Sequence, residues 1–337
     1  MANYDTVTLL EAIELMSIDT SFLSDMFFSD KETILTDTFE FDIVKSGKKL
    51  APFVADGKNI EAAKRDGFET KTFTIPTVGE AKVLTGADLK KRLAGETMYS
   101  SKSPSDRANY YKGRDLAELI KKHTRRHEKM VADLMFNGAI SVVGDGVNKV
   151  IDFGFTNKET LVNPWGGVSS DIFGDISAWK SKLRKSNTNA NVLVVGQDVA
   201  EIMLKDEKFQ KLYDLKSIDN GSIVPKDVKE GGTFIGTMRL QGIDIYQYES
   251  YYEDDDGVVK PFIPEGHVVM ASSNYMGKFI FGAVTLLGED GNWETFESEY
   301  VPQYIYDQDA NTSKFKVYSK PLPVPFDVDS WISCKVI

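Results

Sequence analysis

Cysteine is almost absent from this chain of 337 residues, since Cys334 is the only one. An intramolecular disulfide is therefore excluded, and so is a zinc cluster built on cysteine ligands. We expect the protein to work in a reducing compartment. Histidine is nearly as scarce, with three residues, so the sequence offers few candidates for imidazole-based chemistry.

Positive charge is missing from the first 30 residues, which contain no Lys or Arg but six acidic residues. This pattern is the opposite of a secretory signal or an Arg-rich transit peptide. Long apolar runs are missing too. The longest, residues 279–288, is about half of the ~20 residues that a membrane helix needs. We expect a protein that is synthesised in the cytoplasm and enters no membrane.

The remaining composition is typical of a folded globular protein. Hydrophobic residues make up 42% of the chain and charged residues 27%. A chain of this length is enough for about two domains that bury roughly 75% of the unfolded surface. The 51 acidic residues outnumber the 40 basic ones, which gives a net charge of −11.

Local patterns predict a helical N-terminus followed by an apolar arm. Thr8 and Glu11 have the spacing of a capping box, so we expect a short helix from Thr8. Residues 18–28 then gather more apolar surface than a short helix can hide. The apolar residues of this arm are Phe22, Leu23, Met26, Phe27 and Phe28. We expect the arm to pack on another element or on another subunit.

Two alternating segments, 34–44 and 72–75, predict a pair of long strands. The segment between them, 44–70, is broken by one Ser-Gly and two Asp-Gly turn signals. Its basic residues are Lys45, Lys48, Lys49, Lys58, Lys64 and Arg65. We expect a long protruding hairpin that is too polar to form a core and needs a partner to hold it.

The longest helical pattern covers residues 106–137. Apolar residues recur every three or four positions from Leu116 to Leu134, and Asn137-Gly138 ends the pattern. At ~1.5 Å per residue such a helix approaches about 45 Å, long enough to be the spine of a domain. Further along we expect a strand at 149–156, a helix from about Asp175, a strand-turn-helix unit at 191–204, and strands within 233–252 and 262–287.

Charge is segregated along the chain. Residues 279–313 contain no Lys or Arg and seven acidic residues, among them Glu294, Glu297 and Glu299. The predicted hairpin has the opposite sign. Complementary charge on separate segments suits head-to-tail self-association, in which one copy meets a different surface of the next. An acidic stretch is explained equally well by solubility alone.

The strongest catalytic candidate is the pair His123 and His127. Their i, i+4 spacing places both imidazoles on one helix face, as zinc ligands require. In zinc proteases a glutamate follows the first histidine, and Thr124 stands there instead. Both histidines also fall on the apolar stripe of the helix, so we favour a packed structural role over a metal-dependent hydrolase.

The same helix carries a basic run that can contact nucleic-acid phosphates. Its members are Lys121, Lys122, Arg125, Arg126 and Lys129. No aromatic residues are interleaved, and the chain as a whole is acidic. We therefore favour a solvated helix face with local acidic partners over a nucleic-acid contact.

No motif supports an enzyme or a bound cofactor. Residues 253–257 lack the alternating ligands of a calcium loop, so we expect the tip of a hairpin there. Residues 144–149 lack the third glycine of a dinucleotide site and the Gly-Lys-Ser/Thr of a phosphate loop. His267 is most consistent with a strand entry. We expect no catalytic residue, cofactor or metal.

The order of segments resembles the lambda-type major capsid proteins of tailed bacteriophages, the phage major capsid protein E family. The resemblance spans nearly the whole chain, in the expected order. It is carried by IDTSFLSDMFFSD at 18–30, VIDFGF at 150–155, DIFGDISAWKSKLR at 171–184, NVLVVGQDVAEIML at 191–204, FIPEGHVVMASSNYMGKFIFGAV at 262–284 and KVYSKPLPVPFDVDSWISCKV at 316–336.

This resemblance implies an α+β architecture, the Hong Kong-type phage capsid fold. The domains then expected are an N-terminal arm at 1–33, an extended loop at 34–78, a peripheral domain at 79–175 with the spine helix at 106–137, an axial domain at 176–265, and a return to the peripheral domain at 266–337. The extended loop is expected to lie over a neighbouring subunit.

The function implied is that of a major capsid subunit. It assembles into pentamers and hexamers of an icosahedral shell around double-stranded phage DNA, and the precursor shell expands on packaging. The implied partners are the chain itself, a scaffolding protein, a portal protein, a decoration protein and, by weak non-specific contact, the packaged DNA. The implied location is the virion capsid, after synthesis in the cytoplasm of the bacterial host. An encapsulin-like nanocompartment shell is the alternative within the same fold.

Two sets of residues are the expected contact sites. The subunit interface is expected at Phe22, Phe27, Phe28, Lys48, Lys49, Lys58, Lys64, Arg65, Glu294, Glu297 and Glu299. Contact with DNA, if the basic helix face makes one, is expected at Lys121, Lys122, Arg125, Arg126 and Lys129.

Overall fold

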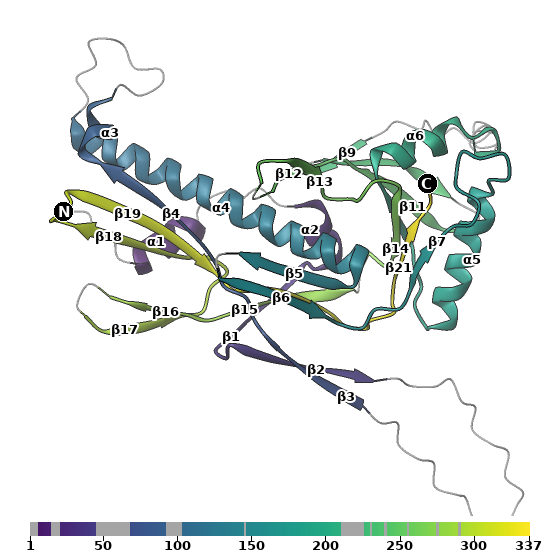
Figure 1. Ribbon diagram of the computed structural model, residues 1–337, viewed down its shortest axis with the longest axis horizontal. Coiled ribbons are helices and arrows are strands. Elements are labelled where there is room, and N and C mark those ends of the chain that lie inside the picture. Colours follow the sequence, from purple (N-terminus) through teal and green to yellow (C-terminus); the bar gives the residue numbers. More distant parts are fainter. Residues whose placement is uncertain are drawn as a thin grey trace, which may run out of the picture.

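The computed structural model describes residues 6–14, 21–44, 68–91, 103–144, 146–209, 226–229, 231–238, 241–254, 256–273, 276–288 and 291–337. It is an elongated α+β plate in which one long helix, α4, connects two strand-rich ends (Figure 1). The helices are α1 Thr6–Glu14, α2 Phe22–Phe27, α3 Gly86–Lys90, α4 Pro104–Asn137, α5 Ile172–Lys185 and α6 Gln197–Lys205.

One end of the plate is built on a seven-stranded mixed sheet with the order β7-β21-β14-β8-β11-β10-β9. These strands are β7 Lys158–Thr160, β8 Val192–Val195, β9 Lys226–Lys229, β10 Gly232–Met238, β11 Ile243–Tyr248, β14 His267–Ala271 and β21 Ile332–Lys335. Helices α5 and α6 lie at this end (Figure 1). Strand β14 pairs with β8 of the expected axial segment, and β21 joins the same sheet between β14 and β7. The predicted boundary at residue 266 therefore runs through this sheet.

The rest of the plate consists of smaller sheets. Strand β15 pairs with β1 and β20, and β19 pairs with β18 and β4. The three two-stranded hairpins are β2–β3, β5–β6 and β16–β17, and β12–β13 forms a fourth pair. The bounds are β1 Asp30–Ile34, β2 Thr38–Val44, β3 Phe68–Thr74, β4 Val78–Thr85, β5 Ala139–Gly144, β6 Val147–Asp152, β12 Tyr251–Glu253, β13 Val259–Pro261, β15 Gly277–Gly282, β16 Val284–Leu287, β17 Trp293–Phe296, β18 Val301–Asp307, β19 Thr312–Ser319 and β20 Pro321–Pro325.

Helix α4 confirms the predicted spine and begins two residues before the predicted start. Ser103 and Asp106 form a reciprocal capping box, and Pro104 occupies the first turn, where its missing N–H costs nothing. The helix ends at Gly138, which has a φ of 63°. A Cβ there would lie 2.2 Å from Cβ of Phe155, so glycine is required both for the left-handed turn and for the close packing.

The predicted starts of two other helices were wrong. Helix α1 begins at Thr6, so Thr8 lies inside it and is not its N-cap. Helix α5 begins at Ile172 because the Asp171 side chain accepts a hydrogen bond from the Gly174 N–H, which caps the helix before Asp175.

Two successive parts of α4 pack on two different cores. Leu116, Leu119 and Ile120 join a cluster with residues of β18 and β19. From Met130 to Phe136 the helix belongs to the largest cluster, which also contains α2, β15 and β20. Burial of this kind contributes roughly 1.5–3 kcal/mol for each large side chain, so α4 holds the plate together along most of its length.

His123 lies at the contact between α4 and β19. Its side chain is 2% exposed, and its Nε2 lies 3.1 Å from the carbonyl oxygen of Val317. Nδ1 has no hydrogen-bond partner within the described part of the chain. Burial therefore lowers the pKa of His123 to about 4, because the charged imidazolium would be desolvated there.

The apolar arm around α2 is anchored by a buried carboxylate, Glu128 of α4. Its Oε1 accepts hydrogen bonds from the N–H of Leu23, at 2.8 Å, and from the Tyr248 hydroxyl, at 2.9 Å. Its Oε2 accepts from the N–H and the hydroxyl of Ser24, at 3.0 and 2.6 Å. The N-cap residue of α2, Ser21, forms no side-chain cap, so Glu128 satisfies N–H groups at the start of α2 from another helix.

Around this carboxylate the arm is fully packed. Phe22, Phe27 and Phe28 are 2%, 3% and 1% exposed, and the Phe22 ring stacks on that of Tyr248 at 5.1 Å. The expectation that these three phenylalanines form a subunit interface is therefore corrected, because they fill the core of their own chain. Of the two alternatives for the arm, packing on another element of the same chain is the one that the structure shows.

The Glu128 contacts predict a large effect of a small change. Replacing Glu128 with Ala leaves two buried backbone N–H groups and the Tyr248 hydroxyl without their acceptor, which we expect to destabilise the unassembled subunit by about 3 kcal/mol. Urea unfolding measures this. The control is Glu201→Ala, which removes an exposed pair with Lys205 and should change stability by less than about 0.5 kcal/mol. Equal losses in the two variants would contradict the assignment.

The pKa of His123 predicts acid sensitivity. Because the pKa is lower in the folded chain than the ordinary 6.5, the stabilisation is complete above pH 6.5 and is lost as the pH falls toward 4. Between pH 7 and pH 5 the free energy of unfolding should fall by about 2 kcal/mol because of this group. His123→Gln, which can still donate to Val317, should lose less stability over that interval. Stability is measured by urea unfolding at the two pH values. Equal losses of stability in the unmodified protein and in the variant would contradict the assignment of this acid sensitivity to His123.

Candidate assembly surfaces

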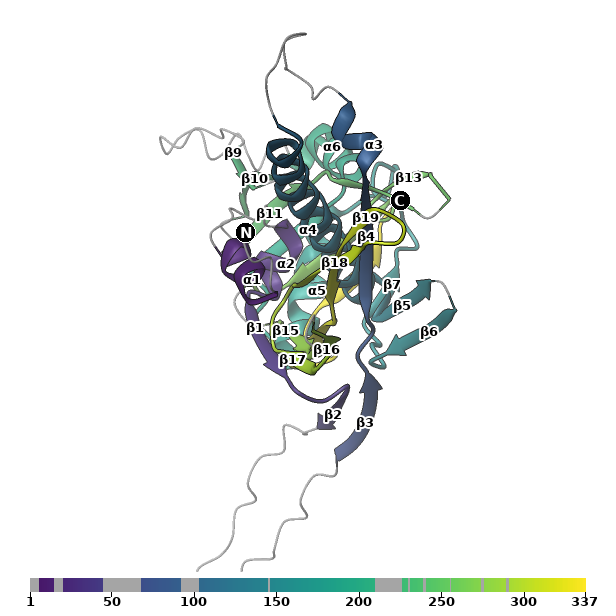
Figure 2. The ribbon, with the colours of Figure 1, turned by 90° about the vertical axis from the view of Figure 1, so that its left-hand side faces the viewer.

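The β2–β3 hairpin is the most prominent projection of the molecule. Its strands pair antiparallel, as expected of a hairpin, from Thr38 opposite Thr74 to Val44 opposite Phe68. The hairpin leaves the body of the plate and points away from it in both views (Figures 1 and 2). At its base the rings of Phe41 and Phe73 pack on Phe153, with centroids 5.6 and 4.9 Å apart.

The described residues end at Val44 and resume at Phe68. The basic residues expected at the subunit interface, Lys48, Lys49, Lys58, Lys64 and Arg65, therefore lie outside the described residues.

The acidic segment divides into exposed and paired carboxylates. Glu294 and Glu297 are exposed, on and just after β17. Glu299 is instead paired within its own chain, since its Oε2 lies 2.6 Å from Nζ of Lys31. Of the three acidic residues expected at the interface, only Glu294 and Glu297 are thus open to a neighbour in the isolated subunit.

Beside these carboxylates lies an aromatic groove of about 660 Å³ between the β16–β17 hairpin and strands β18 and β19. Trp293, 72% exposed, and Tyr306, 53% exposed, line it together with Leu287. Large aromatic side chains so open to water are typical of surfaces that another protein covers.

The basic run lies on one face of α4, as predicted. Lys121, Lys122, Arg125 and Arg126 are exposed, and Lys129 is partly buried. Lys122 and Lys129 have acidic partners in the same chain. Lys122 pairs with Glu80, and Lys129 pairs with Asp133 at 2.5 Å. The favoured interpretation, a solvated face with local acidic partners, therefore applies to this part of the run.

Arg125 differs from these two lysines. Within the described residues its guanidinium forms no ion pair, and it borders both a groove of about 540 Å³ and a smaller one of about 170 Å³. It is the cation of the run best placed to meet an external anion.

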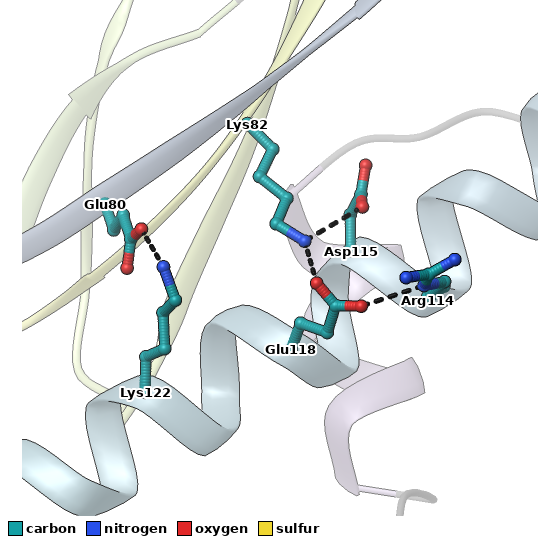
Figure 3. A network of polar contacts seen from close by, with 6 residues as sticks. All are labelled: Glu80, Lys82, Arg114, Asp115, Glu118 and Lys122. Atoms are coloured by element: carbon teal, nitrogen blue, oxygen red, sulfur yellow. Dashed lines mark hydrogen bonds and ion pairs between the residues drawn. The ribbon is translucent and has the colours of Figure 1, made fainter. Parts of the chain in front are cut away.

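An ion-pair network fixes strand β4 to α4 (Figure 3). Lys82 of β4 lies between Asp115, at 3.2 Å, and Glu118, and Arg114 contacts Glu118 from the preceding turn at 2.8 Å. The hydrogen bonds from Lys82 and then Arg114 lower the pKa of Glu118 to about 2. Lys122 and Glu80 extend the network by one turn. This network could not be predicted from the sequence, because the lysine and its carboxylates are 33 and 36 residues apart.

The two helix histidines have a packed structural role, as favoured. His127 is 4% exposed, lies 3.3 Å from the Ser319 hydroxyl and stacks on the ring of Tyr300 at 5.6 Å. Burial lowers its pKa, as it does that of His123. Among the residues that the structure covers, no group of three metal-ligating side chains comes together.

The remaining motifs also have structural explanations. Strand β12 ends at Glu253 and pairs with β13 from Val259, and between them the Gly257 N–H donates to the Asp254 carbonyl at 2.8 Å, as expected of a hairpin tip. His267 is the first residue of β14, a strand entry as expected. Cys334 is buried, and burial raises its pKa to about 12, so its thiol is unreactive. No helix of the described chain is long and apolar enough to span a bilayer.

Solved structures similar to this one include several capsid proteins. A candidate capsid protein of a prophage of E. coli CFT073 superposes with a TM-score of 0.73 at 16% identity, and the match covers 100% of both chains. Gordonia phage Cozz gives 0.51 at 9% identity, over 96% of this chain and 88% of that one. The capsid of an empty GTA particle gives 0.51 at 10% identity, over 95% and 97%. At these identities the likeness shows the fold, and the expected Hong Kong-type capsid fold is confirmed.

The sequence itself identifies the family. A comparison with curated proteins gives no match. The profile of the family described as phage major capsid protein E matches residues 5–336. Since that match spans almost the entire chain, the protein belongs to the phage major capsid protein E family and is a structural subunit of a phage capsid.

Proposed function

We propose that this subunit assembles with copies of itself into pentamers and hexamers of an icosahedral shell, which encloses double-stranded phage DNA and expands when the DNA is packaged. The observation that carries the proposal is the pairing of a rigid plate with a projecting hairpin. The α4 helix and its two cores form the plate, and β2–β3 projects away from it. A closed shell multiplies modest contacts of this kind through multivalency.

The site of synthesis and the other partners follow from the same proposal. The subunit is made in the cytoplasm of the bacterial host and becomes part of the virion capsid. A scaffolding protein guides assembly, a portal protein occupies one vertex, and a decoration protein binds the completed shell. The match to a phage capsid family favours this assignment over the encapsulin-like shell.

The domains are proposed as expected from the sequence, with one modification. Residues 1–33 form the arm, 34–78 the extended loop and 79–175 the peripheral domain. The axial domain is centred on 176–265 and also includes β7 of the preceding segment and β14 and β21 of the returning segment, because all three strands belong to its sheet. The extended loop lies over a neighbouring subunit, where its lysines meet carboxylates of that neighbour.

Contact with DNA is weak and non-specific. The subunit carries a net charge of −11, and a wall that attracted phosphates strongly would hinder the movement of DNA during packaging. The cationic face of α4 contributes the attraction that remains, through Arg125 more than through the ion-paired Lys122 and Lys129.

The assembly itself is tested by electron microscopy and light scattering of the purified protein at near-physiological salt. Closed shells, tubes, or rings of five and six subunits are expected. A protein that remains monomeric at high concentration, both alone and when co-expressed with the scaffolding protein of its phage, would overturn the proposal.

The loop contact predicts a charge-swap experiment. Reversing Lys48, Lys49 and Lys58 to Glu should impair shell formation while leaving the subunit folded, because like charges then face each other across the interface. Adding Glu294→Lys and Glu297→Lys should restore part of the shell yield. Normal shells from the triple variant would show that these lysines do not hold neighbouring subunits together.

The DNA contact predicts a smaller salt effect in one variant. Replacing both Lys121 and Arg125 with Gln should lower the dependence of log affinity on log salt by about one to two, as fewer counterions are released on binding to a DNA duplex. Fluorescence anisotropy with labelled duplex DNA measures this. Lys314→Gln, at an exposed cation of β19, is the control and should behave like the unmodified subunit. An unchanged slope in the double variant argues against DNA contact at this face.

A further inference from the structure

One half of the β5–β6 hairpin is buried in the core, and the other half is exposed to solvent. At the end near α4, Ile140 and Ile151 are opposite each other and are 0% and 5% exposed. Toward the turn, Val143, Val147 and Val150 are 60%, 46% and 63% exposed. Three β-branched apolar residues in so few positions are unusual on a surface that faces water.

The register places two of these valines together. Val143 is opposite Asn148 and Ser141 is opposite Val150, so the side chains of Val143 and Val150 lie diagonally on one face of the hairpin. Val147 is opposite Gly144, on the other face near the turn. The exposed half therefore presents an apolar face that nothing in the described chain covers.

The edges of the hairpin are open as well. In the part of the chain that the structure describes, β5 and β6 pair only with each other, and each has an outer edge of backbone groups without a ladder partner. Exposed edges are commonly protected by proline, by a bulge or by several charges. Here the two strands contain no proline and no bulge, and within the strands Lys149 is the only charged residue apart from Asp152 at the base. Such an edge is a template for an added strand.

The location of the hairpin indicates which partner approaches it. It stands out from the body on one side in Figure 2, next to the base of the β2–β3 hairpin. Phe153, directly after β6, contacts the rings of Phe41 and Phe73, and Nζ of Lys71 lies 3.4 Å from the Asp152 carbonyl. A neighbouring subunit that meets the projecting loop at its base therefore also meets this hairpin.

We propose that the β5–β6 hairpin is a contact site for a second copy of this chain, which adds an extended segment to the open edge and covers Val143 and Val150. The inference rests on the proposed self-assembly and extends it to a surface other than the loop and the acidic segment. The contact uses backbone hydrogen bonds and apolar burial. It should therefore persist at salt concentrations that weaken the charged loop contact.

Hydrogen exchange followed by mass spectrometry, on shells and on unassembled subunits of the unmodified protein, tests the contact. Outward-facing amides in peptides covering 139–152 should exchange at least tenfold more slowly in shells. Exchange at equal rates in the two states would overturn the proposal. Because electron microscopy of the same samples establishes whether shells are present, a failure of this inference is distinguishable from a failure of assembly.

A pair of variants tests the side chains. Val143→Asp combined with Val150→Asp should reduce the yield of shells at least tenfold, since the two charges would be buried under the neighbour. The matched control is Val162→Asp combined with Val168→Asp, which changes two valines that are 94% and 108% exposed in the loop before α5. Unassembled subunits of both variants should unfold at the urea concentration of the unmodified protein. A full shell yield from the Val143/Val150 variant would overturn the contact.

Discussion

Glu128 is the one interaction on which the arrangement of the subunit depends. Its carboxylate is 1% exposed and receives hydrogen bonds from α2 and β11 while it is itself part of α4. A six-residue helix such as α2 is not stable alone, because helix nucleation is unfavourable and so few residues cannot repay it. Its docking on α4 therefore supplies both its cap and its hydrophobic contacts. Burial raises the pKa of Glu128, so the site is costly to build and specifies one docking geometry.

This clamp connects the two ends of the plate. Tyr248 belongs to the seven-stranded sheet, and α2 leads into β1, which pairs in parallel with β15 in the central sheet. Helix α4 extends from there to β4 and β19, where the Lys82 network and His123 fix its first half. The plate is thus held by buried contacts along one helix. The surfaces that we propose for assembly are projections from it, namely the β2–β3, β5–β6 and β16–β17 hairpins.

The sequence predicted the parts of this structure that depend on neighbours in the chain. The apolar period and the stop at Gly138 lie within or beside α4, so its limits were predicted to within two residues, although its cap at Ser103 was not. The β2–β3 pairing and the β8–α6 unit were predicted for the same reason. The family and its fold followed from the order of several such segments, which is more specific than any one of them.

What the sequence could not predict depends on partners far apart in the chain. Glu128 is 105 residues from Leu23 and 120 from Tyr248, and in the sequence it resembles any acidic residue of a charged helix. Phe22, Phe27 and Phe28 of the apolar arm were expected at a subunit interface. Their pattern shows that an apolar face must be buried, but it does not show whether the same chain or a neighbouring subunit buries it. Glu299 was expected there for a similar reason, since its pairing with Lys31 spans 268 residues.

The most direct test of this account is a cryo-electron-microscopy reconstruction of the assembled shell at side-chain resolution. The account predicts that α2 remains docked on Glu128 of its own chain in every subunit and that the plate around α4 is unchanged. Subunits meet through the hairpins that project from it. A shell in which α2 occupies the Glu128 site of a neighbouring subunit, or in which that carboxylate faces solvent, would contradict it.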